Sequence, residues 1–196
     1  MKLKIHESKN LAIINIMSKN LLLLCMLAVT LSCCNKNDDQ PANPIDQLPP
    51  ATQTGKQTFG CLINGAPFVP PSFGSNSPNA FYQFVDGAYT LSIYGSIGGG
   101  LNLKSINIGG MDVGLIQETT YTLKEENSNN YFGKYNIGGG ITYSGTSSTE
   151  NSGTLKITNF DQDNFIISGT FEFTVLDNDG NEINITNGRF DINYTN

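Results

Sequence analysis

The clearest hydrophobic pattern in the chain lies in residues 165–176, where apolar and polar side chains alternate. Apolar residues occupy the odd positions, and serine, threonine and glutamate fall between them. Because successive side chains of a strand point to opposite faces, this pattern predicts a long strand with one buried and one solvated face. Residues 177–181, which are rich in Asp, Asn and Gly, then predict a turn.

A second strand is predicted over residues 183–194, and its pattern changes parity part-way. Its apolar residues begin on odd positions at Ile183 and resume on even positions at Phe190. One added residue at Asn187-Gly188 would account for the change, so we expect a β-bulge there.

Similar runs, separated by turn signals, recur through residues 57–196. Asn64-Gly65 and Asp86-Gly87 are typical of the two-residue turns of β-hairpins. The 21 glycines and the absence of tryptophan also favour a turn-rich β protein over a helical one. We therefore expect an all-β fold, an antiparallel β-sandwich of about ten strands, with a closed lipocalin-like β-barrel as the alternative.

Residues 1–33 have the layout of a secretory signal with a leader. Residues 21–31 are an uninterrupted run of mostly apolar side chains that follows Lys19. The run is too short to remain in a bilayer as a spanning helix. A signal of ordinary size would begin at Met17, so the start of translation is open between Met1 and Met17.

The end of this signal resembles the bacterial lipobox, in which a small residue precedes a cysteine that receives lipid. Ser32 before Cys33 fits this pattern, so we expect lipidation at Cys33, with Cys34 as the alternative. An acyl-anchored cysteine with two or three chains gives stable attachment to a membrane.

Residues 34–56 contain several prolines and few apolar side chains, which predicts a disordered tether before the β domain at 57–196. The acidic pair Asp38-Asp39 resembles the export signal by which Bacteroidota send lipoproteins to the outer leaflet. We therefore expect an outer-membrane protein that faces the cell exterior.

The charge balance argues against a nucleic-acid partner. The chain has a formal net charge of −6, with 11 basic and 17 acidic residues. Residues 1–33 include four of the lysines and Glu7, so 7 basic and 16 acidic residues remain after them, a charge of −9. Such a domain would repel phosphate backbones.

Catalytic chemistry is limited by the lack of histidine. His6 is the only histidine and lies in the leader, which excludes a Ser-His-Asp triad and any imidazole zinc site in the domain. We predict no catalytic residue, metal or cofactor. A glycoside hydrolase needs only two carboxylates, for which Glu118, Glu172 and Asp191 are candidates, although acids on strand faces are usually only solvated.

Other polar and aromatic residues have competing interpretations. Asp177–Glu182 resembles part of a calcium loop but lacks the twelfth-position glutamate, so a hairpin turn is favoured. Arg189, the only arginine, is expected to form an ion pair with Asp191 or Glu172 rather than to capture a ligand. Cys61 is expected to be a buried thiol. A sugar-stacking surface and ordinary sheet packing both suit six tyrosines, Tyr82, Tyr89, Tyr94, Tyr131, Tyr135 and Tyr143.

The lipobox, the acidic proline-rich spacer, residues 59–65 (FGCLING) and the closing motifs at 167–173 (ISGTFEF) and 185–191 (ITNGRFD) together resemble a family of uncharacterised Bacteroidota lipoproteins. The resemblance implies location and fold, and no activity. We expect a membrane-anchored cell-envelope lipoprotein that is a non-catalytic binding module for a glycan or protein partner. The alternatives are an accessory subunit of an envelope complex and a two-carboxylate glycoside hydrolase.

Overall fold

The computed structural model describes residues 43–139 and 143–196, which form strands, two short 3-10 helices and no α-helix. The all-β prediction is therefore confirmed, with eleven strands in place of about ten. In chain order the elements are η1 (Pro44–Gln47), β1 (Thr58–Ile63), β2 (Ala66–Phe68), β3 (Asn79–Val85), β4 (Ala88–Ile97), η2 (Gly100–Asn102), β5 (Lys104–Met111), β6 (Thr120–Leu123), β7 (Asn130–Ile137), β8 (Tyr143–Thr146), β9 (Gly153–Asp161), β10 (Ile166–Leu176) and β11 (Glu182–Thr195).

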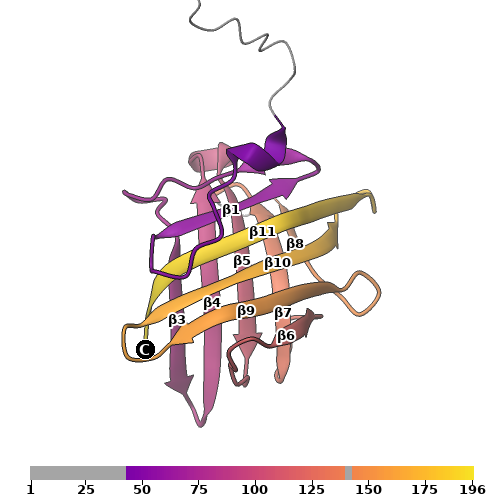
Figure 1. Cartoon of the computed structure of the whole chain (residues 1–196). Helices are drawn as coiled ribbons and strands as arrows, with labels where there is room; N and C mark the ends of the chain where they lie inside the picture. The colour runs from indigo at the N-terminus through magenta and orange to yellow at the C-terminus, as the bar shows by residue number, and fades with distance from the viewer. Residues whose placement is uncertain (1–42, 140–142) are drawn as a thin grey trace, which may run out of the picture. The chain divides into compact units, whose positions relative to one another are not determined.

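All eleven strands belong to one mixed sheet that is folded into two layers. The front layer has the order β2-β1-β11-β10-β9-β6, and the back layer has the order β3-β4-β5-β7-β8. Figure 1 shows β1, β11, β10 and β9 crossing the strands of the back layer at a steep angle. Two short parallel pairings, β11 with β3 and β6 with β7, join the layers. The other pairings between named strands are antiparallel, so the protein has one mixed sheet in place of the purely antiparallel sandwich that was expected.

The inner faces of the two layers enclose one hydrophobic core. Tyr82 of β3 packs edge-on against Phe160 of β9 with ring centroids 5.4 Å apart. Gly133 of β7 lies so close to β10 that an added Cβ would be 2.6 Å from Cγ of Phe173. Ile167 belongs to the same cluster and is fully buried. The predicted alternation therefore sets which face of β10 is inside from Ile167 to Val175, whereas Phe165, which was expected on that face, lies in the turn before β10 with a φ of 54° and is exposed.

The closing hairpin of β10 and β11 contains the predicted bulge. The β10–β11 register shifts between Phe171, opposite Gly188, and Phe173, opposite Ile185. Asn187 takes a φ of 53°, a backbone conformation that asparagine tolerates better than most residues. The extra residue restores the inward direction of Phe190, which is buried. The change of parity in the sequence is thus explained.

Both short hairpin turns also form as predicted. Asn64 and Gly65 have φ values of 48° and 81°, and Asp86 and Gly87 have values of 52° and 94°. Positive φ at both central residues is the requirement of a type I′ turn, whose twist matches that of the flanking strands. These turns connect β1 to β2 and β3 to β4.

Residues 43–56 differ from the disordered tether predicted for 34–56, because they lie against the front layer. Leu48 is buried, and Gly60 of β1 leaves space for Pro49, whose Cδ would be 2.6 Å from a Cβ at that glycine. A few long-range contacts thus hold a segment whose composition alone predicts disorder. The signal at 1–33, Cys33, Cys34 and the rest of the tether lie outside the described residues. In the part of the chain that is described, no helix has the length and hydrophobicity to cross a membrane.

Candidate binding site on the front layer

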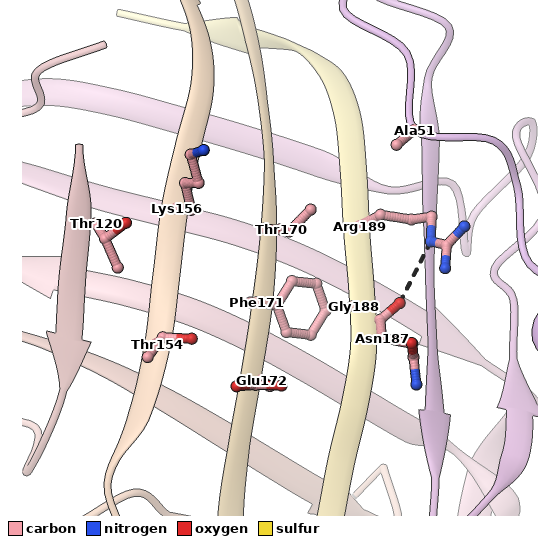
Figure 2. A pocket seen from close by; sticks show the side chains of 10 residues that line it. All are labelled: Ala51, Thr120, Thr154, Lys156, Thr170, Phe171, Glu172, Asn187, Gly188 and Arg189. Carbon is pink, nitrogen blue, oxygen red and sulfur yellow. Dashed lines mark hydrogen bonds between the residues drawn. The ribbon is translucent and has the colours of Figure 1, made fainter. Parts of the chain in front are cut away.

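The front layer carries a hollow of ≈ 560 Å³ on its outer face, away from the core. It lies over β6, β9, β10 and β11, and we call it the front hollow (Figure 2). Its size is within the range of small-molecule sites in proteins. The lining residues are Ala51, Thr120, Thr154, Lys156, Thr170, Phe171, Glu172, Asn187, Gly188 and Arg189.

The upper part of the front hollow is one cross-strand row. Thr120 pairs with Lys156, Lys156 with Thr170, and Thr170 with Arg189. Side chains that are directly opposite each other on neighbouring strands share one face of a sheet. Figure 2 shows Lys156 and Arg189 on either side of Thr170. The register therefore places two cations and two hydroxyl groups side by side on the outer face.

The bulge shapes the lower part of the front hollow. Thr154 pairs with Glu172 in the next row. At the bulge, two residues of β11 lie opposite Glu172, and Asn187 is one of them. A bulge bends its strand and increases the local twist, which opens the outer face at this point. Ala51, from the segment that lies on the front layer, lines the hollow near Arg189. The sequence signal for the bulge was therefore also a signal for the site.

Arg189 does not form the predicted ion pair. Among the described residues, no carboxylate lies within 4.0 Å of its guanidinium. Its Nε donates to the backbone oxygen of Asn187 at 3.3 Å, and its Nη1 donates to the backbone oxygen of Pro49 at 3.4 Å. The prediction was wrong because Asp191, two residues along, is held by other donors, and because Glu172 lies one row away. Arg189 is half-buried in the front hollow.

Lys156 has only a loose partner. Its Nζ lies 3.8 Å from Oε2 of Glu118, and both side chains are well exposed to solvent. An exposed ion pair of this kind contributes roughly 0–1 kcal/mol to stability and is easily exchanged for another anion. Lys156 is therefore available to a ligand in the front hollow.

The three acids that were candidates for glycoside hydrolysis are not brought together in the front hollow. Glu172 lines it, whereas Glu118 lies beside Lys156 and is not part of the lining. Asp191 is fully buried. A two-carboxylate mechanism requires both groups to reach one glycosidic bond, which a buried Asp191 does not do.

Asp191 instead anchors the segment that precedes β1. Its carboxylate accepts hydrogen bonds from the Thr52 hydroxyl at 2.6 Å, from the Ser168 hydroxyl at 2.8 Å and from three backbone N–H groups. The three N–H donors belong to Thr54, Gly55 and Lys56, at 3.0, 2.7 and 3.1 Å.

The hydrogen bonds to Asp191 also set its ionisation. Burial by itself raises the pKa of the carboxyl, but the bonds from Thr52, Thr54, Gly55 and Lys56 outweigh burial and hold the pKa below its usual value. Hydrogen bonds to the charged form favour that form. The group is therefore a structural anion.

The tyrosines do not form a sugar-stacking surface in the front hollow, since none of them lines it. Tyr82, Tyr135 and Tyr143 are buried, which fits ordinary sheet packing. Tyr89 is exposed, and its ring stacks on that of Tyr82 at 4.5 Å.

An exposed apolar surface is present at the β3–β4 turn, and we call it the hairpin end. It consists of Phe84, Val85 and Tyr89, of which Phe84 is 63% exposed. The Phe84 and Tyr89 rings pack edge-on at 5.1 Å. Phe84 is on the same face of β3 as the buried Ala80 and Tyr82, but it lies next to the turn, where it is exposed.

The remaining candidate residues have structural roles. Asp177 Oδ1 accepts from the backbone N–H groups of Asp179 and Asn181, so the favoured hairpin turn is present between β10 and β11. Within residues 43–139 and 143–196, no three His, Cys, Asp or Glu side chains are grouped as metal ligands. Cys61 is a buried free thiol, as predicted, and burial raises its pKa far above the usual range.

Fold and site together describe an all-β protein with a polar hollow on the outer face of one layer. Residues 74–191 match the family described as Domain of unknown function (DUF6252), and the chain belongs to that family. The matched region runs from just before β3 to Asp191 and includes both closing motifs. Comparison with the curated proteins and with the solved structures finds no match for this chain.

Proposed function

We propose that this protein is a cell-envelope lipoprotein of Bacteroidota, anchored in the outer membrane through lipid on Cys33 or, alternatively, Cys34. Its domain faces the cell exterior and acts as a non-catalytic binding module for a glycan. The lipobox-like end of the signal and the acidic pair Asp38-Asp39 support the anchor and its direction. The front hollow supports the binding role.

The observation that carries the glycan proposal is the chemistry of the front hollow. Hydroxyl groups of Thr120, Thr154 and Thr170 and the amide of Asn187 line it, and each both donates and accepts hydrogen bonds. A ligand covered in hydroxyl groups is matched by such a surface. The lining of the hollow extends over four strands, β6, β9, β10 and β11, which suits a segment of a polymer.

Binding is tested with the full chain, purified in detergent, on an array of bacterial, plant and host glycans. Thr170→Trp places a bulky ring in the middle of the front hollow and should abolish the binding seen with the unaltered chain. Ser144→Trp is the control, because Ser144 is exposed on β8 of the back layer and does not line the hollow. Undiminished binding by Thr170→Trp, equal to that of Ser144→Trp, would place the ligand elsewhere, and the absence of any bound glycan would contradict the proposal.

The anchor is tested separately by growth in labelled palmitate. Label should enter the protein and be lost when Cys33→Ala and Cys34→Ala are combined, with the two single variants identifying the acylated residue. Unchanged labelling of the double variant would contradict the lipobox. Protease treatment of intact cells should remove the domain, whereas complete protection would contradict display on the exterior.

A second function, an accessory subunit of an envelope complex, is favoured by the hairpin end. Exposed aromatic residues at Phe84 and Tyr89 are typical of protein interfaces. The hairpin end lies opposite η1, where the described chain begins (Figure 1). Crosslinking in cells should then recover a partner through a photoreactive residue at position 84 but not at Leu101, which is also exposed; recovery of the protein alone would contradict this function.

A further inference from the structure

We infer that the front hollow recognises an acidic glycan, one that carries carboxylate or sulfate groups, and that Arg189 and Lys156 bind those groups. The inference rests on the proposed glycan-binding function and names the class of glycan. Three observations support it: the unused hydrogen-bond donors of Arg189, the position of Lys156 in the same row, and the contrast between the two cations of the hollow and the net negative charge of the chain.

Arg189 has unused hydrogen-bonding capacity. A guanidinium has five N–H donors, and the two bonds to the Asn187 and Pro49 carbonyls leave three without an acceptor among the described residues. The charge is half-buried and has no carboxylate partner in the described chain. The donors that lack a protein acceptor are not buried, because no nitrogen of Arg189 is among the buried polar atoms without a partner in the described chain, so a ligand can reach them. A carboxylate or sulfate group would accept two parallel hydrogen bonds from them, which is the geometry that arginine prefers.

The same two carbonyls fix the direction of the guanidinium. Asn187 belongs to the bulge, and Pro49 belongs to the segment that Asp191 holds on the front layer. The cation is therefore oriented before a ligand arrives, which lowers the entropy lost on binding.

Lys156 provides a second cation in the same row. It is two strands away from Arg189, with Thr170 between them, so their backbones are separated by roughly 10 Å. A chain with repeated acidic groups would contact Arg189 with one group and Lys156 with another, while Thr170 bonds a hydroxyl of the sugar between them.

The net negative charge of the protein restricts where an acidic polymer can bind, and the row that contains Lys156 and Arg189 is such a place. The chain has a net charge of −6, so its surface as a whole repels an acidic polymer. The front hollow is lined by two cations and one acid, Glu172, and a second acid, Glu118, lies outside the lining as the loose partner of Lys156. Glu172 lies one row below Arg189 and Lys156, where it would accept hydrogen bonds from sugar hydroxyls and repel an acidic group placed in the wrong register.

The test measures binding of the full chain, purified in detergent, to polygalacturonate and to the same polymer with its carboxylates reduced to alcohols. Dextran sulfate and dextran form a second pair that separates sulfate from carboxylate recognition. The unaltered chain should bind at least one acidic polymer at least about tenfold more tightly than its neutral counterpart. Raising the salt concentration should weaken the acidic binding and leave any neutral binding unchanged.

Arg189→Gln and Lys156→Gln should each reduce the acidic binding by at least about tenfold. Lys104→Gln is the matched control, since it removes the same charge from an exposed position on β5 in the back layer. It should change the affinity less than about twofold. Arg189→Lys, which keeps the charge and loses the planar fork, should fall between the unaltered chain and Arg189→Gln. Thermal unfolding of each variant checks that the fold is retained.

Three outcomes overturn the inference. Equal affinity for acidic and neutral polymers leaves the glycan module in place and removes the acidic specificity. An equal loss in Lys104→Gln and Arg189→Gln shows attraction by overall charge and not by the hollow. If the chain binds none of these polymers and no glycan on the array, the proposed function is contradicted as well. The two failures are therefore distinguishable.

Discussion

The hydroxyl of Thr52 donates a hydrogen bond of 2.6 Å to the carboxylate of Asp191, across 139 positions of sequence. This contact ties the segment before β1 to the last strand of the domain. The same segment provides Ala51 and the Pro49 carbonyl next to Arg189. Folding of the N-terminal segment and formation of the front hollow are therefore linked through one buried carboxylate.

Asp191→Asn should lower the free energy of unfolding by about 3 kcal/mol, because an amide replaces a charged acceptor of five hydrogen bonds. Urea unfolding at neutral pH measures the change. Asp163→Asn is the control, since Asp163 is exposed in the β9–β10 turn, and should alter stability by less than about 0.5 kcal/mol. Similar stability of the two variants would show that the carboxylate is not a structural anchor.

The stabilisation by Asp191 should depend on pH in a defined direction. Hydrogen bonds from Thr52 and from the N–H groups of Thr54, Gly55 and Lys56 lower its pKa in the folded protein despite the opposing effect of burial. The contribution is therefore complete above the unfolded pKa of about 3.9 and is lost as the pH falls through the lower folded value. The gap in stability between the unaltered chain and Asp191→Asn should narrow from pH 7 to acidic pH in thermal melts. A gap that widens on acidification would contradict the lowered pKa.

Gly133→Ala should destabilise the fold by about 1–3 kcal/mol through overpacking between the layers. The added methyl group would lie 2.6 Å from Cγ of Phe173, and both partners are buried. Gly99→Ala is the matched change without a clash, because Gly99 has an extended φ of −173° and no described neighbour within 4 Å of a Cβ. Equal melting temperatures for the two variants would mean that β7 and β10 are not in close contact.

Cys61 should resist alkylation in the folded protein. Its side chain is fully buried, so an alkylating reagent does not reach the sulfur. Burial also raises the pKa of the thiol, so the reactive thiolate is not formed. Labelling with iodoacetamide is measured in a full-length chain in which Cys25, Cys33 and Cys34 are replaced by Ala. The reagent should modify Cys61 only in denaturing urea. Rapid labelling in buffer would contradict the burial of β1 in the core.

Much of the local structure could be predicted from single residues and their spacing. The odd positions of residues 165–176 predicted the buried face of β10, and the change of parity predicted the bulge at Asn187-Gly188. Asn64-Gly65 predicted a hairpin with the observed backbone signs. These predictions succeed because strand alternation and turn geometry depend on neighbours in sequence.

The site was predicted less well. Glu172 and Arg189 were recognised as candidates, but Arg189 was assigned an ion pair that the structure does not contain. Lys156, Thr120 and Thr154 were not singled out, because polar residues on the solvent face of strands look alike in the sequence. Their meeting in the front hollow follows from the register of four strands, which the alternating pattern leaves open.

The sequence by itself determined that this is an all-β domain, which face of β10 is inside, and where the hairpins turn. Only the tertiary structure decided that β11 also pairs with β1 and β3, that Asp191 receives the segment around Thr52, and that Arg189 shares a row with Lys156 and forms no ion pair of its own. The physical reason is distance along the chain. Alternation and turns are fixed by adjacent residues, whereas the pairing of β1 with β11 and the bond from Thr52 to Asp191 join residues more than a hundred positions apart and depend on how the whole core packs.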